Sequence, residues 1–218
     1  MNDPTNNVVY VVDDDPPVLK AVARVLRSAG YQAVTFSSSQ RFLDQHDTAV
    51  PCCVVLDLAM PGISGLELQM KLAAARTEMP IIFLTGQGDV PTSVKAMKQG
   101  AADFLTKPVE REALLGAVRV ALGKDHARRI AQQEMAETLR RLSSLTSREY
   151  EVFEHVIKGD LNKQTAAELG AAEKTIKVHR SRVMDKMQVR SVAALVRMAE
   201  RAGIAVPAEE QQRVRHSF

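Results

Sequence analysis

The sequence contains no tryptophan, only two cysteines and few aromatic residues of any kind. The scarcity of aromatics predicts hydrophobic cores built mainly from aliphatic side chains. The cysteines are the neighbours Cys52 and Cys53, whose side chains would point to opposite faces of a strand, so a disulfide between them is not expected. We interpret both as small buried hydrophobic residues and expect a reducing, cytoplasmic environment.

The sequence also lacks long apolar runs. None approaches the roughly 20 residues that a membrane-spanning helix needs, and the polar first residues do not have the pattern of a signal peptide. We therefore expect no membrane partner. Residues 1–122 carry 11 Lys and Arg against 13 Asp and Glu, whereas residues 123–218 carry 18 against 13. This asymmetry predicts two domains with different partners.

The first half alternates between short apolar runs and segments whose apolar residues recur at helical spacing. The apolar runs cover residues 8–13, 32–36, 52–57, 79–85 and 102–106. The helical segments cover residues 16–30, 38–46, 65–76, 90–100 and 110–122. Because the runs are apolar throughout, they predict an α/β doubly wound fold, a five-stranded parallel sheet with helices on both faces.

The second half has a different pattern. Residues 123–144 contain neither Gly nor Pro after Gly123, which predicts a helical linker, either a simple spacer or a helix that coils against a partner. Short helical segments follow, the first with a capping signature at Thr146, Ser147 and Glu149, and they predict a small all-α domain. The predicted division is into residues 1–122, a linker 123–144, a helical domain 145–205 and a flexible tail 206–218.

Polar residues stand where the predicted strands end. Parallel strands present their carboxyl ends at one edge of the sheet, where ligands bind. The residues at this edge are Asp13, Asp14, Asp15, Asp57, Thr85 and Lys107. Clustered carboxylates repel one another unless a cation joins them, which predicts a divalent ion such as Mg²⁺. With that ion and Lys107 beside it, Asp57 is a candidate nucleophile toward a phosphoryl donor.

Each of these residues alone has an ordinary explanation. Asp57 could be a turn residue, Lys107 a solvated charge and Asp15 a helix cap. Their convergence on one edge favours a functional site. An enzyme remains an alternative, in which Asp13 attacks a phosphate ester and Asp15 acts as the acid, but such an enzyme would not need Asp57.

The motifs VVDDD, LDLAMPGISG, FLTGQGD and ADFLTKP resemble, in order and spacing, the receiver domain of two-component response regulators across residues 8–122. The resemblance implies a flavodoxin/CheY-like fold with Asp57 as the phospho-accepting aspartate. It also implies Mg²⁺ at the acidic pair and at Asp57, with ligands from Asp13, Asp14, Asp57 and the backbone carbonyl of Ala59.

The same resemblance implies roles for residues after the fourth and fifth runs. Thr85 and Lys107 would contact the phosphoryl group, and the Lys107–Pro108 bond would be cis. Phe104 stands where this family has a rotating aromatic switch, although an ordinary core aromatic explains it equally well.

Residues 173–190 carry several basic side chains together with an apolar face formed by Ile176, Val183, Met184 and Met187. A basic helix that follows a short helix and a tight turn is typical of a helix-turn-helix, although a solvated basic face is the alternative. The segment 145–203 resembles the LuxR-type helix-turn-helix of NarL/FixJ-type regulators. The resemblance implies base contacts from Lys177, Val178 and Ser181, flanked by Thr175, His179 and Arg180, and phosphate contacts from Lys163 and Arg190.

Together these features predict a phosphorylation-dependent transcriptional regulator of a two-component system, and not an enzyme. Its expected partners are a histidine kinase, promoter DNA, a second copy of the chain and, as a further candidate, RNA polymerase. Two phosphorylated receivers would pair through the fourth helix and fifth strand. A protein that binds DNA independently of phosphate remains an alternative. The sequence also leaves open whether the unphosphorylated receiver covers the DNA-binding helices or merely stays monomeric.

Overall fold

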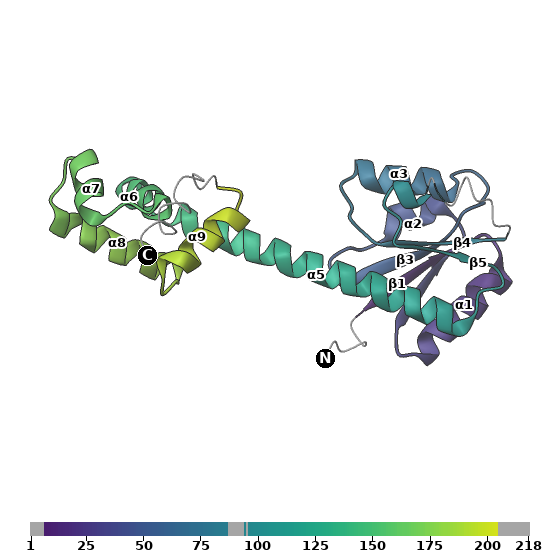
Figure 1. Ribbon diagram of the computed structural model, residues 1–218. Helices are drawn as coiled ribbons and strands as arrows, with labels where there is room; N and C mark the ends of the chain where they lie inside the picture. The colour runs from purple at the N-terminus through teal and green to yellow at the C-terminus, as the bar shows by residue number, and fades with distance from the viewer. Residues whose placement is uncertain (1–6, 87–93, 95, 205–218) are drawn as a thin grey trace. The chain divides into compact units, whose positions relative to one another are not determined.

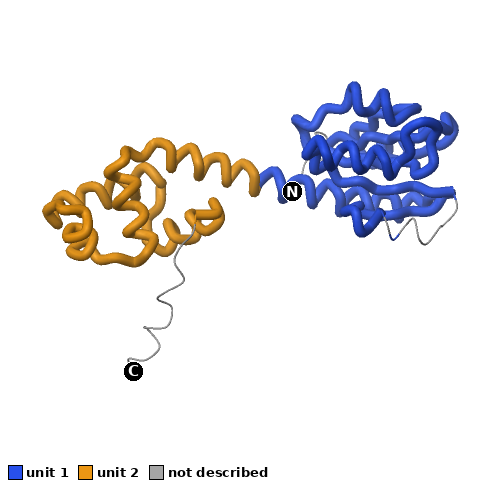
Figure 2. Tube along the Cα trace, turned by 90° about the horizontal axis from the view of Figure 1, so that it is seen from above, with its two compact units in different colours: residues 1–130 blue, residues 131–218 orange. Residues whose placement is uncertain are grey.

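The computed structural model describes residues 7–86, 94 and 96–204. The chain divides into two compact units, residues 1–130 and 131–218 (Figure 2). None of the described helices combines the length and the hydrophobicity that crossing a bilayer requires. The predicted tail 206–218 lies outside the described residues.

The first unit is built on a parallel five-stranded sheet, as predicted. Its strands are β1 (Val8–Val12), β2 (Gln32–Phe36), β3 (Cys52–Asp57), β4 (Ile81–Thr85) and β5 (Asp103–Thr106). Their order across the sheet is β2-β1-β3-β4-β5, and all neighbouring pairs are parallel. From β1 the chain goes to β2 on one side and then to β3, β4 and β5 on the other. The direction of winding therefore changes between β1 and β3, whose carboxyl ends lie next to each other.

Helices cover both faces of this sheet (Figure 1). They are α1 (Pro16–Ser28), α2 (Ser39–Gln45), α3 (Gly65–Ala74) and the first part of α5 (Arg111–Ser143). Of the helix predicted at 90–100, residues 94 and 96–98 are helical and residues 99 and 100 form a turn, while 90–93 and 95 lie outside the described residues. Helices α2 and α3 lie on one face, and α1 and α5 lie on the other.

The alternation of side chains along each strand produces two hydrophobic cores. Tyr10 and Phe83 belong to the core beside α2 and α3, whereas Val11 and Ile82 belong to the core beside α1 and α5. Cys52 and Cys53 are both buried and unpaired, one in each core, which confirms their interpretation as small hydrophobic residues.

The helical segment predicted at 110–122 and the helical linker predicted at 123–144 form one continuous helix, α5, which passes Gly123 without a break and ends at Ser143. Glycine inside a helix costs about 1 kcal/mol relative to alanine, which the strong helix formers after it can offset. The two helical turns that follow residue 122, the predicted end of the first domain, are also attached to the sheet. The fully buried Asp125 accepts a hydrogen bond from the backbone N–H of Cys52 (3.1 Å) and pairs with Arg128 and Arg129. The two compact units therefore separate after Ile130, and the finer division of the chain remains a prediction.

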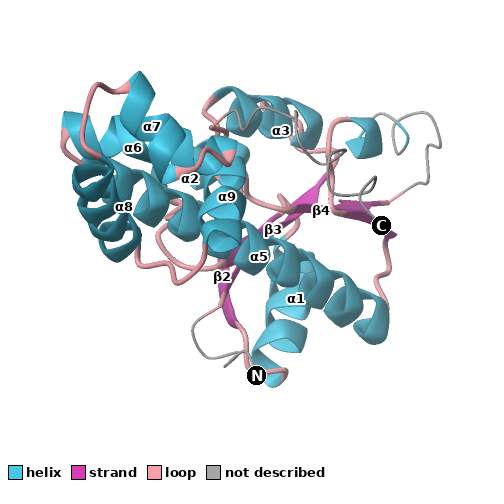
Figure 3. Ribbon diagram, turned by 60° about the vertical axis from the view of Figure 1, so that its left-hand side comes forward, coloured by secondary structure: helices cyan, strands magenta, loops and turns pink. Residues whose placement is uncertain are grey.

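The described part of the second unit consists of helices and loops (Figure 3). After the end of α5 come α6 (Ser147–Lys158), α7 (Asn162–Glu168), α8 (Glu173–Met187) and α9 (Val192–Arg201). Val152, Phe153, Ile176 and Val183 lie at the centre of its core. The short helical segments expected from the sequence after the linker are therefore confirmed as helices.

The predicted capping signature at the start of α6 is present, since Thr146 and Glu149 form a reciprocal capping box. Glu149 has a second role, because its carboxylate lies 2.6 Å from the ammonium of Lys186 on α8. Although only 3% of Glu149 is exposed, its charge is therefore compensated. This residue holds the start of α6 against the end of α8.

Candidate functional site

The polar residues predicted to converge on one edge of the sheet do converge there. Asp13 follows β1, Asp57 ends β3, Thr85 ends β4 and Lys107 follows β5. Asp13 is completely buried, and Asp57 and Thr85 are each 5% exposed. Polar groups so far from water need partners, because burial without them is costly.

Lys107 supplies the positive charge of this site. Its Nζ atom lies 2.6 Å from Asp13 Oδ2 and 3.2 Å from Asp57 Oδ1, so one ammonium bridges two carboxylates that come from different strands. Burial raises the pKa of Asp57, the neighbouring Asp13 raises it further, and Lys107 offsets part of this shift. Burial lowers the pKa of Lys107, but its contacts with Asp13 and Asp57 outweigh that effect and the pKa rises.

Asp14 adds a third carboxylate to the cluster. One oxygen from each of Asp13, Asp14 and Asp57 lies within 4.8 Å of the others, and only Asp14 is exposed. A single ammonium does not neutralise three carboxylates. All-oxygen ligands of this kind suit a hard divalent cation such as Mg²⁺, so the donor set fits that ion. The backbone N–H of Ala59 donates a hydrogen bond to Asp57, which places Ala59 beside the cluster.

Thr85 and Phe104 lie on the neighbouring strands. The backbone N–H of Lys107 donates to the Thr85 carbonyl (2.7 Å), and the Lys107–Pro108 bond is cis. The half-buried Phe104 packs against Phe83, with ring centroids 6.4 Å apart. This contact is compatible both with a switch residue and with a core aromatic, so the role of Phe104 remains a prediction.

Gly65, which the sequence reasoning missed, also shapes the site. It is the first residue of α3, and a Cβ atom there would lie well inside van der Waals contact with the backbone carbonyl of Asp57. Only glycine therefore lets α3 start so close to the end of β3. The signal in the sequence was the second glycine of the motif PGISG, but its spacing alone does not reveal the close approach.

The residues predicted to contact DNA lie on or near α8. Ile176, Val183 and Met187 form the buried side of this helix. The predicted contact residues with exposed side chains are Lys163, Thr175, Lys177, Val178, Ser181 and Arg190. Helix α8 is therefore amphipathic, with a partly basic exposed face. Ala172 at its N-cap makes no side-chain capping bond.

His179 and Arg180, also predicted near DNA, are half-buried. Arg180 Nη1 donates to the carbonyl of Asp160 (3.3 Å) and to Asn162 Oδ1 (3.4 Å). These bonds link α8 to the turn before α7. Arg180 thus helps to hold the helix pair together, whatever it contributes to DNA binding.

A receiver-type acidic site on a doubly wound sheet, followed by a helix-turn-helix unit, defines a class of protein. Residues 9–119 match the family described as response regulator receiver domain, and residues 143–199 match bacterial regulatory proteins of the luxR family. The chain belongs to the response regulators of two-component systems, of the NarL/FixJ type. Members of this family are transcription factors and not enzymes, so the phosphohydrolase alternative is wrong. Their two domains imply a histidine kinase and DNA as partners.

Individual relatives are similar along nearly the whole chain. Nodulation protein W of Bradyrhizobium diazoefficiens is 44% identical over 96% of this chain and 92% of its own. Transcriptional regulatory protein FixJ of Azorhizobium caulinodans is 42% identical over 95% of this chain and 98% of its own. The solved structure of response regulator StyR has a TM-score of 0.82 at 45% identity, and covers 89% of this chain and 98% of the StyR chain.

Proposed function

We propose that Asp57 accepts a phosphoryl group from a histidine kinase and that this modification controls binding of α8 to promoter DNA. One observation carries the proposal: Lys107 bridges Asp13 and the strand-end Asp57 in a chain that also has a LuxR-type unit. An oxygen of Asp57 attacks the phosphorus of the kinase's phosphohistidine. The P–N bond breaks, the P–O bond forms and the imidazole leaves as the base.

Several residues around Asp57 would stabilise this transfer. Lys107 neutralises charge on the phosphoryl oxygens, and the Thr85 hydroxyl donates to one of them. Asp13, Asp14, Asp57 and the Ala59 carbonyl would hold Mg²⁺, which when bound supplies further positive charge at those oxygens.

We further propose that phosphorylation changes the face made by the fourth helix and β5. Thr85 moves toward the phosphoryl group, Phe104 turns inward and two receivers pair through this face. Pairing brings two copies of α8 to half-sites one DNA turn apart, about 34–36 Å. The protein would act in the cytoplasm with promoter DNA, and RNA polymerase is a further candidate partner.

At the DNA, we propose that Lys177, Val178 and Ser181 contact base edges, with Thr175, His179 and Arg180 beside them. Lys163 and Arg190 would contact phosphates, which fix the position of the protein without reading sequence. The exposure of Lys177, Val178 and Ser181 on one side of α8 supports this assignment.

The phosphorylation step can be tested with acetyl phosphate and Mg²⁺. The wild-type chain is expected to gain one phosphoryl group by intact-mass spectrometry, and Asp57→Asn is expected to gain none. Asp15→Asn is the matched control, because Asp15 is exposed and lies outside the carboxylate cluster. Normal uptake by Asp57→Asn would contradict the proposal.

The link to DNA can be tested by footprinting promoter DNA with and without phosphorylation. We expect protection to appear at lower protein concentration after phosphorylation, and Asp57→Asn to remove this difference. Equal protection in both states would instead favour a DNA-binding protein that is independent of phosphate.

A further inference from the structure

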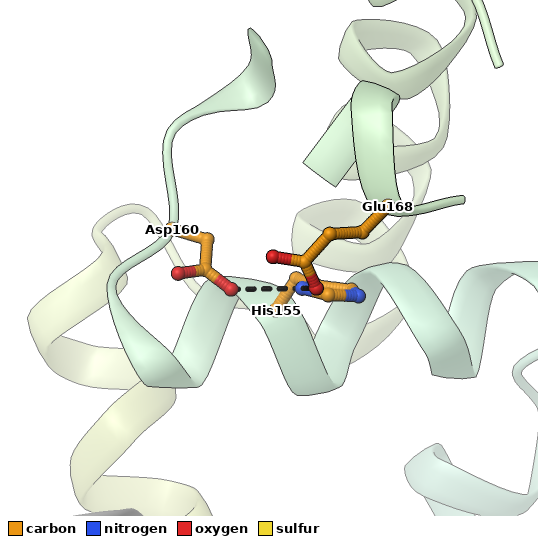
Figure 4. A group of neighbouring side chains, drawn as sticks. All are labelled: His155, Asp160 and Glu168. Carbon is orange, nitrogen blue, oxygen red and sulfur yellow. Dashed lines mark hydrogen bonds and ion pairs between the residues drawn. The ribbon is translucent and has the colours of Figure 1, made fainter. Parts of the chain in front are cut away.

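A second cluster of ligand atoms lies in the helix-turn-helix unit, far along the sequence from the acidic site. His155 is in the last turn of α6, Asp160 is in the turn that follows, and Glu168 is the last residue of α7 (Figure 4). His155 Nδ1 lies 2.8 Å from Asp160 Oδ2 and 3.8 Å from Glu168 Oε2. The cluster therefore joins three consecutive segments at one imidazole nitrogen.

The charges of this cluster are not balanced by ordinary ion pairs. Within the described ranges, neither Asp160 nor Glu168 pairs with a lysine or an arginine, whereas Glu149 and Glu137 in the same unit do. An imidazole nitrogen has either one proton or one lone pair, so it serves one strong partner at a time. The hydrogen bond to Asp160 accounts for one carboxylate, but not for the second, whose oxygen lies 3.8 Å from the same nitrogen.

We propose that His155, Asp160 and Glu168 form a binding site for a divalent transition-metal ion, represented by Zn²⁺. One nitrogen and two carboxylate oxygens are a ligand set that zinc accepts, with water as the fourth ligand. The side chain of His155 is only 12% exposed, and that of Glu168 is 64% exposed, so the site is anchored on one side and open to water on the other.

The two distances from His155 suit this ion after a small adjustment, and the oxygens of Asp160 and Glu168 lie within 4.8 Å of each other. Ligand atoms on tetrahedral zinc are about 3.3 Å apart, given metal–ligand bonds of about 2.0–2.1 Å. The two contacts of His155 lie on either side of that value. Shifts of about half an ångström would bring both distances to this value, and the exposed side chain of Glu168 has room to move by that amount.

The ligand set also separates this site from the acidic cluster of the receiver. Asp13, Asp14 and Asp57 offer oxygen only, which suits Mg²⁺, whereas an imidazole nitrogen favours zinc and its neighbours in the transition series. Excess Mg²⁺ should therefore fill the receiver site and leave the His155 cluster available for Zn²⁺.

Binding at this position would affect the DNA-binding helices. The ion would tie α6, the turn after it and the end of α7 together. The same turn accepts the hydrogen bonds of Arg180, so α8 would be held by a more rigid support. When free Zn²⁺ is ten times the dissociation constant, local opening of this region should become about 11-fold rarer, if the open form does not bind the ion.

The test is a calorimetric titration of the full-length chain with Zn²⁺ in excess Mg²⁺. We expect one zinc ion per wild-type chain and at least tenfold weaker binding by Glu168→Gln, which keeps the His155–Asp160 hydrogen bond. Glu154→Gln is the matched control, because it removes the same charge from an exposed position one residue before His155, and it should bind like wild type. Glu168→His replaces one ligand by another and should restore zinc binding.

Hydrogen exchange provides the second measurement. Free Zn²⁺ at ten times its dissociation constant should slow amide exchange in residues 155–170 of the wild type about 11-fold, and should leave Glu168→Gln unchanged. Equal zinc binding by wild type and Glu168→Gln would overturn the proposal, as would the absence of saturable binding to wild type. Loss of the zinc ion in Asp14→Asn would assign it to the receiver and overturn the proposal in the same way.

Discussion

Lys107 is the residue on which the charge balance of the acidic site depends. Breaking a buried ion pair by removing one partner is more destabilising than replacing both, because a charge is left without compensation. In Lys107→Ala, the buried carboxylates of Asp13 and Asp57 would face each other without the ammonium between them. Their mutual repulsion would then oppose folding directly.

We therefore expect Lys107→Ala to lower the free energy of unfolding by about 3 kcal/mol in the absence of Mg²⁺. Urea unfolding of wild type and variant measures this difference. Lys20→Ala is the control, because Lys20 is an exposed residue of α1. Addition of Mg²⁺ should restore part of the loss, and equal stability without Mg²⁺ would show that Lys107 does not balance the two carboxylates.

Glu149 gives the second unit a defined response to pH. The hydrogen bond from Lys186, together with those from Thr146, lowers the pKa of Glu149 from 4.5 to about 2. A carboxyl group whose pKa is lower in the folded state stabilises the fold above its unfolded pKa, and this stabilisation is lost as the pH falls through the folded pKa. The contribution of Glu149 is thus complete above pH 4.5 and disappears toward pH 2.

Glu149→Gln should accordingly be less stable than wild type near neutral pH, and the difference should shrink as the pH falls from 4.5 toward 2. Residue-resolved NMR of the α6 and α8 amides during urea titration measures this difference separately from the receiver. Glu154→Gln on the same helix is expected to show neither effect, because Glu154 is exposed. A difference that stays constant with pH would mean that Glu149 acts through packing and not through its charge.

Among the elements, the turns of α5 that follow Gly123 are held to the sheet by Asp125. This carboxylate accepts hydrogen bonds from Arg128, Arg129 and the N–H of Cys52, and Arg129 continues to the carbonyl of Val50 (2.7 Å). Burial raises the pKa of Asp125, but these hydrogen bonds outweigh it and the pKa is lowered. The group is therefore ionised wherever the protein is folded near neutral pH.

Asp125→Ala should release the turns of α5 that follow Gly123, because two arginines lose their partner and the Cys52 N–H loses its acceptor. We expect a loss of about 3–5 kcal/mol in the stability of the receiver. Hydrogen exchange should accelerate in residues 123–130 and at the start of β3. Glu112→Gln, an exposed change in the first turn of the same helix, serves as the control. Unchanged exchange in Asp125→Ala would show that packing alone fixes these turns.

Helix α8 and the neighbouring α7 should show two kinds of DNA contact. Lys177→Ala is expected to cost about 1–3 kcal/mol at a specific site and to relax sequence preference there. Lys163→Ala should weaken binding to all sequences alike and reduce the slope of log affinity against log salt by about 1. Fluorescence anisotropy at several salt concentrations separates the two, and the opposite pattern would exchange their roles.

The elements show what the sequence can and cannot predict. The convergence of Asp13, Asp57 and Lys107 could be predicted from the sequence, because all strands of a parallel sheet have their carboxyl ends at the same edge. The attachment of the α5 turns after Gly123 to the sheet was not predictable, because it depends on the hydrogen bond from the N–H of Cys52 to Asp125, 73 residues away. Local patterns determine which element forms, whereas such pairings appear only once the elements are packed.

At the scale of the whole molecule, phosphorylation at one unit must alter DNA binding by the other. Pairing of receivers, as proposed above, is one mechanism, and release of helices that the unphosphorylated receiver covers is the alternative. Pairing converts the second half-site contact into an intramolecular one, so the gain depends on two half-sites with matching spacing. Release improves each copy separately, so the gain does not depend on the number of half-sites.

The two mechanisms therefore make opposite predictions for DNA with a single half-site. If pairing is the mechanism, phosphorylation should raise affinity for the two-site DNA by about 5–150-fold, the usual range for coupled sites. On the single site it should change affinity by less than about twofold, because no second contact can form. Anisotropy measurements with both DNAs, using wild type and Asp57→Asn, provide the comparison. A gain of equal size on the single site would rule out pairing as the source of the effect, since a lone copy of α8 has no second half-site to use.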